Sequence, residues 1–188
     1  MHNTYVLVEV NIMDTRLANL LGALALAVGD ASTQAMCDES GLSTSAVSAL
    51  IVIGNNPRLN VEGVSKTIRL AHSSTVRLLE KLQELSLVEP HTGEDRRCVE
   101  YSLTRKGRKT VEKMLKRREH ALATFVKAGV GPETKRSLAD HLDSLLTTAS
   151  TDAVACSRIC RLCDETACDL DRCPVERVSR RLTLHSNG

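Results

Sequence analysis

The stretch Leu70-Ala-His-Ser-Ser-Thr-Val-Arg-Leu-Leu-Glu-Lys-Leu82 is the part of the chain that indicates its fold most clearly. Small polar residues at positions 72–75 precede an apolar stripe with helical spacing, which predicts a capped amphipathic helix. A shorter helical pattern over about 61–70 comes directly before it. Two helices joined by a short turn are typical of a helix-turn-helix, in which the second helix enters the major groove of DNA.

The hydrophobic period changes from helical to alternating after this stretch. Leu87-Val-Glu89 indicates a short strand, Thr92-Gly-Glu-Asp-Arg-Arg97 a polar loop, and Val99-Glu-Tyr-Ser-Leu103 a returning strand. Thr104 is placed to cap a long basic helix that ends near Lys127. The sequence therefore predicts a two-stranded wing attached to the helix-turn-helix.

Helical patterns also flank this unit. Apolar residues predict a first helix from Asp14 to about Cys37 with Asp14 as its N-cap, a second from Ser43 or Thr44 to Ile53, and a last one over about 133–148. The order of these elements indicates a winged helix-turn-helix inside a helical frame.

Charge is distributed unevenly along the 188 residues. The net charge is +2, but residues 66–118 carry fourteen Lys and Arg against seven Asp and Glu, a net of +7. Such a basic block predicts a polyanionic partner. Phe125, Tyr5 and Tyr101 are the only aromatic residues, which argues against a base-stacking surface for single-stranded nucleic acid.

Residues 14–148 resemble the MarR family of winged-helix transcriptional regulators. The resemblance rests on residues 70–82, on Leu87-Val-Glu, on Glu94-Asp-Arg-Arg97 and on Leu103-Thr-Arg-Lys-Gly-Arg108. The wing signature of this family is Asp, any residue, then Arg. Two positions depart from the family: Ser86 replaces a glycine before the first wing strand, and Gly63 lies in the supporting helix.

The resemblance implies a surface that reads duplex DNA. Hydroxyls at a helix N-terminus can bind phosphate, and the Arg77 guanidinium can bind guanine through two hydrogen bonds. In wings of this family the aspartate, here Asp95, steadies the arginine, here Arg97, that enters the minor groove. The residues expected at the DNA are Ser73, Ser74, Thr75, Arg77 and Lys81 of the helix and Asp95, Arg96 and Arg97 of the wing.

The resemblance also implies a homodimer built from the first and last helices of the unit. We therefore predict a mainly α fold with a small β-hairpin wing, a winged helix-turn-helix framed by N- and C-terminal dimerisation helices. Its partners are a second copy of the chain and double-stranded DNA with a pseudo-palindromic site. We expect a transcriptional regulator acting as a repressor; the sequence identifies no small-molecule effector.

The chain divides into three parts. Residues 1–13 form an N-terminal arm, residues 14–150 the MarR-like unit, and residues 151–188 a cysteine-rich tail. The tail spacing Cys-x2-Cys-x4-Cys-x4-Cys equals that of a zinc knuckle with cysteine as the third ligand, and four thiolates can hold zinc tetrahedrally. The expected ligands are Cys160, Cys163, Cys168 and Cys173, with Cys156 as a possible extra or substitute ligand.

Two other interpretations of the tail remain open. An iron–sulfur cluster is favoured by the Cys-x2-Cys start and by the final cysteine, which is followed by Pro174. A thiol redox switch is the third interpretation. The tail can respond to metal or oxidant, and transmit this state through the dimer helices, or it can serve as a structural clip.

Residues 17–29 form an apolar run that imitates the hydrophobic region of a signal peptide. Glu9 and Asp14 precede the run, where a signal peptide carries positive charge, and thirteen residues are too few to span a bilayer. We interpret the run as an amphipathic helix, expect no membrane association, and expect a cytoplasmic protein. Cysteines stay reduced in that compartment, and a dense cluster then favours metal over disulfides.

Enzymatic chemistry is not indicated. The ten glycines form no phosphate-binding loop, and no His-Glu-x-x-His motif occurs. The alternative function is a winged helix used for protein contact, with a structural zinc clip and no sensing role. A module that binds only protein has no need of Asp95, Arg96 and Arg97 together, so DNA binding is the favoured interpretation.

Overall fold

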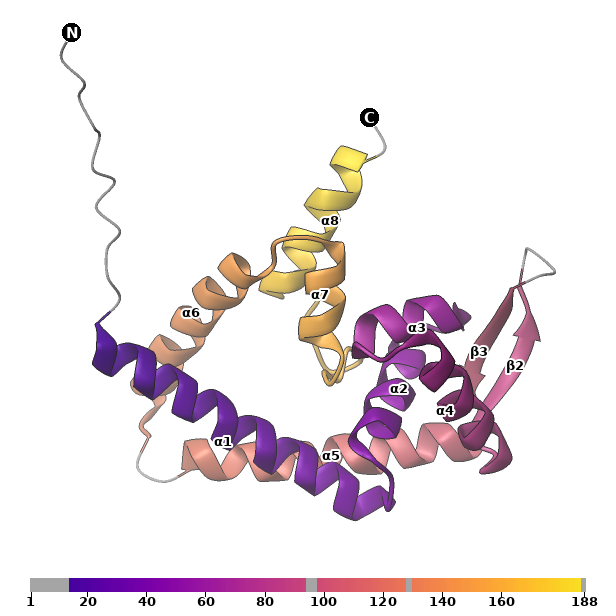
Figure 1. Ribbon diagram of the computed structural model, residues 1–188. Helices are drawn as coiled ribbons and strands as arrows, with labels where there is room; N and C mark the ends of the chain where they lie inside the picture. Colours follow the sequence, from indigo (N-terminus) through magenta and orange to yellow (C-terminus); the bar gives the residue numbers. More distant parts are fainter. Residues whose placement is uncertain (1–13, 94–97, 128–129, 187–188) are drawn as a thin grey trace, which may run out of the picture.

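The computed structural model describes residues 14–93, 98–127 and 130–186 (Figure 1). In this part of the chain the elements, in order, are α1 (Thr15–Ser40), α2 (Thr44–Asn55), β1 (Leu59–Asn60), α3 (Val61–Ile68), α4 (His72–Glu84), β2 (Val88–Thr92), β3 (Val99–Leu103), α5 (Arg105–Lys127), α6 (Pro132–Ala149), α7 (Ala153–Cys160) and α8 (Pro174–Ser186). The predicted mainly α fold with a small wing is confirmed.

Helix α2 is the centre of the core. Every residue from Ala46 to Ile53 is buried, and α1, α4, the wing and α5 surround this helix. Met36 of α1, Leu79 of α4 and Met114 of α5 are each fully buried in the same cluster. A helix that is apolar on all sides belongs in the interior, which explains why α2 shows no polar stripe.

Four helix starts, three of them predicted, are stabilised by side-chain caps. Asp14 accepts a hydrogen bond from the backbone N–H of Arg16 (2.9 Å), and Ser43 accepts one from Ala46 (3.4 Å). The last two caps are Asn60, which accepts from Gly63 (2.9 Å), and Thr104, which accepts from Gly107 (3.0 Å). Each cap satisfies a backbone donor that has no partner within the helix.

The wing contains one more strand than the predicted hairpin. β2 and β3 pair antiparallel as expected, and β1 pairs with the other side of β3, which gives the order β1-β3-β2. The Arg58 side chain, which precedes β1, forms an ion pair with Glu100 of β3 (3.2 Å). The two-residue strand β1 therefore ties the wing to the start of α3.

Pro90 lies in β2, at the free edge of this sheet, directly opposite Tyr101. The Tyr101 carbonyl accepts a hydrogen bond from the backbone N–H of Arg58 (3.1 Å), so the backbone groups of Tyr101 point toward β1. Pro90 and Tyr101 are therefore a non-hydrogen-bonded pair. The missing N–H of Pro90 removes no bond from the β2–β3 ladder, because at this position it would face the outer edge.

Ser86 ends α4 in a left-handed conformation with φ +57°. The N–H of Ser86 donates to the carbonyl of Gln83 (2.8 Å), and the N–H of Leu87 donates to the carbonyl of Leu82 (2.9 Å). These two bonds form a Schellman motif in which Ser86 holds the position that favours glycine. The departure from the MarR pattern noted at this residue thus places a β-carbon in a strained conformation.

Replacing Ser86 with glycine is expected to raise the free energy of unfolding by about 0.5–1 kcal/mol. Relief of the left-handed strain outweighs the added entropy of the unfolded chain. Urea denaturation monitored by circular dichroism measures the change. The matched control is Ser144→Gly inside α6, which is expected to lose about 0.5–1 kcal/mol instead. A loss of stability in Ser86→Gly would contradict the interpretation.

Two glycines allow close packing at the joints of the unit. A β-carbon on Gly107 would lie 2.0 Å from the Leu87 carbonyl oxygen, so α5 can start against the end of α4 only with glycine there. A β-carbon on Gly63 would lie 2.5 Å from Leu59 Cδ1. This contact gives a packing reason for the glycine in α3, where the MarR pattern has a better helix former.

The tail contains two helices that the sequence interpretation did not include. α7 begins after Asp152, whose side chain accepts a hydrogen bond from the N–H of Ala155 (2.9 Å). α8 packs against α7 and reaches α6, where Arg177 forms an ion pair with Asp143 (2.8 Å). The cysteine loop is therefore held between two helices, and these helices lie beside α3 and α6 (Figure 1).

Candidate nucleic-acid interface and cysteine loop

The helix-turn-helix consists of α3, the turn at residues 69–71, and α4. Arg69 makes the turn possible by adopting a left-handed conformation (φ +58°). Leu79 and Leu82 bury one face of α4 against α2, which fixes the rotation of the helix about its axis. The opposite face of α4 is therefore presented to solvent.

Four of the five residues predicted to contact DNA from this helix lie on its exposed surface. Ser73 and Ser74 are exposed in the first turn, and Arg77 and Lys81 follow at spacings of four residues on the same side. These four residues form a continuous surface of two hydroxyls and two cations, which we call the reading face.

Thr75 is an exception. Its side chain is fully buried, and its hydroxyl donates a hydrogen bond to the carbonyl of Ala71 (3.1 Å). Ala71, rather than a residue within 72–75, holds the N-cap position, and no side chain caps the helix there. The prediction of Thr75 as a DNA contact is corrected accordingly: Thr75 stabilises the start of α4 from inside the core.

The predicted wing contacts Asp95, Arg96 and Arg97 lie outside the described residues. The base of the wing adjoins the N-terminal part of α5, where cationic side chains gather. Lys106 Nζ donates to the carbonyl of Leu85 at the end of α4 (2.8 Å). The sequence predicts a basic helix here, but its residues were not among those expected at the DNA. The exposed cations that begin this helix are Arg105, Lys106, Arg108 and Lys109.

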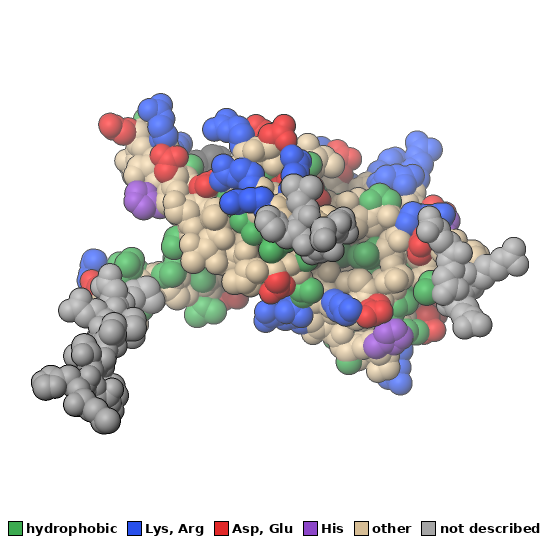
Figure 2. Space-filling model, turned by 90° about the horizontal axis from the view of Figure 1, so that it is seen from above, with side chains coloured by type: hydrophobic (Ala, Val, Ile, Leu, Met, Phe, Trp, Pro, Cys, Tyr) green, Lys and Arg blue, Asp and Glu red, His purple; other side chains and the backbone are tan. Residues whose placement is uncertain are grey.

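Figure 2 shows how side-chain types are distributed over one face of the molecule. Hydrophobic side chains are exposed at the end where α1 begins, and Lys and Arg side chains occur over most of this face together with Asp and Glu. The part that carries the reading face is the more basic one.

The four predicted metal ligands lie on one short segment between α7 and α8. Cys160 is the last residue of α7, and its carbonyl accepts a hydrogen bond from the N–H of Cys163 (2.8 Å). Cys173 directly precedes α8, and its N–H donates to Asp169 (2.9 Å). Asp164 folds the middle of the loop by accepting hydrogen bonds from the N–H of Thr166 (3.1 Å) and of Ala167 (3.3 Å).

The thiols of this loop interact with one another. A hydrogen bond from the Cys160 thiol, assisted by the charges of Arg118 and Arg161, lowers the pKa of Cys163 to about 7 against the opposing effect of burial. The same hydrogen bond raises the pKa of Cys160, to which burial and the charges of Cys163 and Cys173 also contribute. The structure thus places Cys163 and Cys173 close enough to Cys160 to influence its ionisation.

Cys168 completes the set of interacting thiols. Burial raises its pKa to about 11, and the charges of Cys173 and Cys163 add to this effect. The four thiols are paired as Cys160 with Cys163 and Cys168 with Cys173. As these side chains stand, the described residues contain no group of three or more His, Cys, Asp or Glu that could hold a metal ion.

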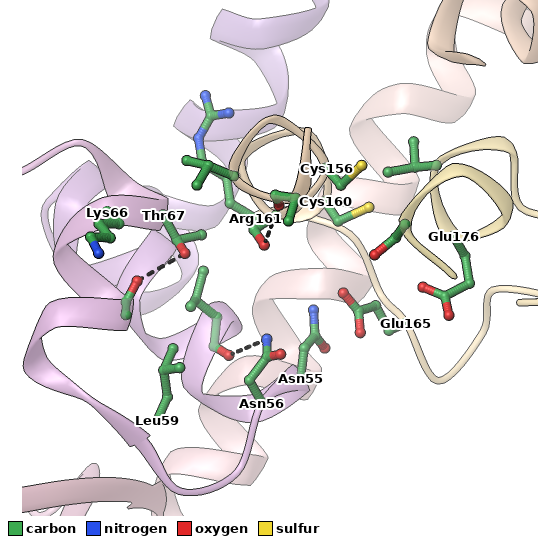
Figure 3. Close-up of a pocket in the computed structure, with 17 residues that line it drawn as sticks. Asn55, Asn56, Leu59, Lys66, Thr67, Cys156, Cys160, Arg161, Glu165 and Glu176 are labelled. Atoms are coloured by element: carbon green, nitrogen blue, oxygen red, sulfur yellow. Dashed lines mark hydrogen bonds between the residues drawn. The ribbon is translucent and has the colours of Figure 1, made fainter. Parts of the chain in front are cut away.

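Cys156 differs from these four residues. It is buried between α7 and α8, and burial raises the pKa of its thiol. Figure 3 shows Cys156 and Cys160 on the side of α7 that faces Glu165 and Glu176, in a cavity of about 340 Å³ between α2, α3, α7 and α8. The two remaining cysteines, Cys37 and Cys98, lie outside the tail, and Cys98 is exposed.

Comparison with known families supports the assignment of the winged helix. A family model described as MarR family matches residues 40–97, which include α2, α3, α4 and β2. The winged-helix region of this chain is therefore similar to the MarR family over these residues.

Solved MarR-type structures share the fold over a larger part of the chain. A MarR family protein from Bacillus stearothermophilus is 22% identical, with a TM-score of 0.61, and covers 69% of this chain and 90% of its own. A Mycobacterium tuberculosis protein, RV1404, is 17% identical, with a TM-score of 0.62, and covers 71% and 91%. CouR from Rhodococcus jostii RHA1, bound to p-coumaroyl-CoA, is 25% identical, with a TM-score of 0.54, and covers 70% and 92%.

The cysteine loop lies outside the residues matched by the MarR family model, which end at residue 97. Comparison of the sequence with curated proteins finds no match. In the described part of the chain one helix, α1, is long and apolar enough by length and composition to cross a membrane. In this fold α1 packs along α5, and Arg117 of α5 forms an ion pair with Glu39 of α1 (3.4 Å).

Proposed function

We propose that this chain is a sequence-specific regulator of transcription that binds duplex DNA as a homodimer and represses by occupying its site. The reading face carries this proposal, because Ser73, Ser74, Arg77 and Lys81 are exposed together at the start of the second helix of a helix-turn-helix. Proteins of the MarR family are transcriptional regulators rather than enzymes, and a regulator of this kind acts in the cytoplasm.

The charge distribution supports the same proposal. Residues 66–118, with a net charge of +7, include α4, the wing and the start of α5. Cations at these positions neutralise phosphates and release counterions from the duplex. For about six phosphate contacts, affinity falls about a thousandfold between about 50 and 200 mM salt.

Replacing Arg77 with alanine is expected to weaken binding to the preferred duplex by about 1–3 kcal/mol, the scale of one good base contact. A duplex selected from a random library of about 30 base pairs accommodates two half-sites one helical turn apart. Fluorescence anisotropy at fixed salt then compares wild type, Arg77→Ala and Arg97→Ala. Arg97→Ala tests the wing and is expected to cost a similar amount.

The matched control is Arg136→Ala, which removes an exposed arginine from α6. This variant is expected to bind with the affinity of the wild type. If all three variants bind every duplex as the wild type does, neither the reading face nor the wing contacts DNA. If the wild type selects no duplex, the alternative of a protein-interaction module is favoured.

The proposed homodimer uses apolar surface that the single chain leaves exposed. α1 carries one stripe of exposed leucines and α6 another, and α6 buries none of its residues within the described chain. Surface of this kind usually marks an association site. The exposed leucines are Leu17, Leu20, Leu21 and Leu24 of α1 and Leu138, Leu142, Leu145 and Leu146 of α6.

We further propose that the tail binds one metal centre through Cys160, Cys163, Cys168 and Cys173, with zinc as the favoured ion and an iron–sulfur cluster as the alternative. The two thiol pairs lie on one short loop, so side-chain rotations can bring them together around an ion. Zinc holds four thiolates tetrahedrally and would close a segment that is too short to form its own core.

Changing any one of these four cysteines to serine is expected to remove most of the bound metal. Metal analysis and an absorbance spectrum of protein purified anaerobically without chelator give the stoichiometry and identify the metal, since an iron–sulfur cluster absorbs visible light and zinc does not. Cys98→Ser is the matched control and is expected to retain the metal. Wild-type protein with neither zinc nor iron near one-to-one stoichiometry would rule out the site.

A further inference from the structure

The cysteine loop is seated on the winged-helix core of its own chain. Leu162 packs against the buried core cluster, and the side-chain amide of Asn55, the last residue of α2, donates to the carbonyl of Cys163 (3.1 Å). The segment between the first two cysteines is thus fixed to the core by one apolar contact and to α2 by one polar contact. A route from the tail through the dimer helices was expected from the sequence; these contacts with the core and α2 form a shorter one.

A second contact joins the tail to the helix-turn-helix itself. Arg158 of α7 donates through Nε to the carbonyl of Lys66 in α3 (3.0 Å). Lys66 lies in the last turn of α3, three residues before the turn that leads to α4. The helix that ends in Cys160 therefore touches the helix that supports the reading face.

Arg118 of α5 provides an unused cation beside the loop. Its Nε is buried and has no hydrogen-bond partner among the described residues. Together with Cys163 and Cys168 it lines a cavity of about 850 Å³ between α2, α5 and the loop.

The net charge of the proposed metal centre is opposite in sign to that of the side chains beside it. Four thiolates around a divalent zinc ion carry a net charge of −2, and an anionic centre at low exposure requires compensating cations. The buried Nε of Arg118 is a donor of the appropriate charge on the side of α5. Arg161, two residues before Cys163 in the loop, is the second cation.

We propose that the metal-loaded cysteine loop controls DNA binding through its own protomer, by holding the end of α2 and α5 in place through Asn55 and Arg118 and α3 through Arg158. The inference rests on the proposed metal centre and on the proposed DNA binding. When the loop holds zinc, its contacts with α2, α3 and α5 are kept, and the reading face is held in the conformation that binds DNA. When zinc is removed, the loop is released from α2 and α5, and operator affinity falls.

The experiment measures affinity for the selected duplex by anisotropy, with zinc-loaded protein and with protein stripped anaerobically by chelator. Stripping the wild type is expected to weaken binding about tenfold, within the usual range of coupling between two sites. In Arg118→Gln, zinc is expected to remain bound, and the difference between the two states is expected to fall to about threefold or less. The matched control, Arg117→Gln, alters the neighbouring arginine that pairs with Glu39 and is expected to keep the tenfold difference.

Hydrogen exchange of the loaded and stripped protein distinguishes the routes. If the loop acts through its contacts with the core, we expect faster exchange in the stripped protein at the end of α2 and in the middle of α5. The change in α1 and α6 is expected to be smaller. Suppose that the protein binds both zinc and DNA, and that its DNA affinity is the same or higher after zinc is stripped. The inference is then overturned, and the proposed function stands. If no zinc binds, the inference fails together with the metal centre, whereas failure to bind any duplex identifies the DNA proposal as wrong.

Discussion

Replacing Gly107 with alanine is expected to lower the free energy of unfolding by about 2–3 kcal/mol. The added β-carbon would lie 2.0 Å from the Leu87 carbonyl oxygen and 3.0 Å from its carbonyl carbon. Both are backbone atoms, so no side-chain rotation relieves the overlap, and α5 must move away from the end of α4. A displacement of this kind in a packed interior costs about 1–3 kcal/mol, and more in unfavourable cases.

Urea denaturation measures this loss, and DNA binding should weaken with it, since the Leu87–Thr104 region connects the recognition helix, the wing and α5. The N–H of Thr104 donates to the same Leu87 carbonyl (3.1 Å) and would lose its partner. The matched control is Gly29→Ala inside α1, where a β-carbon meets nothing within 4 Å. Alanine there is expected to be neutral or to stabilise by up to about 1 kcal/mol. Equal stability of Gly107→Ala and wild type would show that α5 and Leu87 are farther apart in solution.

Replacing Leu21 of α1 or Leu142 of α6 with glutamate is expected to convert the proposed dimer to a monomer and to reduce operator affinity at least a hundredfold. Each side chain is 44% exposed in the single chain, and a charge there would be buried without a partner on association. A monomer binds one half-site only. It loses the gain in affinity that comes from linking two reading faces in one molecule. Light scattering coupled to size exclusion gives the mass, and anisotropy gives the affinity.

Leu26→Glu is the control for this prediction. Leu26 is also in α1 and is 69% exposed, but it lies on the side of the helix opposite the stripe that contains Leu21. Glutamate at this position is expected to leave both mass and affinity unchanged. Monomeric wild-type protein at micromolar concentration, or dimeric Leu21→Glu and Leu142→Glu protein, would show that these stripes do not form the interface.

Local chemistry explains what the sequence could predict. Caps act over two or three residues, so Asp14, Ser43 and Thr104 each indicated a helix start without knowledge of the fold. The second wing strand was predicted with its observed bounds, Val99–Leu103, since its alternation and its flanking residues are also local signals. The reading face was predictable for the same reason, apart from one residue.

Long-range packing explains what the sequence could not predict. Thr75 follows two serines that face solvent, and its burial depends on how α4 is rotated against α2. β1 consists of two residues and exists because β3 offers a free edge to Leu59 and Asn60. The position of the cysteine loop on the core depends on contacts between residues far apart in sequence, such as Asn55 with Cys163 and Arg158 with Lys66. No pattern within the tail indicates these partners.

The position of Pro90 has a consequence for the behaviour of the protein at high concentration. An exposed edge strand can recruit a strand from another molecule, and this pairing is a common route to aggregation. At the outer edge of β2, Pro90 withholds one of the donors that such a strand would need. The wing can therefore project from the molecule without acting as a template for intermolecular sheets, and Pro90→Val is the substitution that would remove this protection while leaving the hairpin register intact.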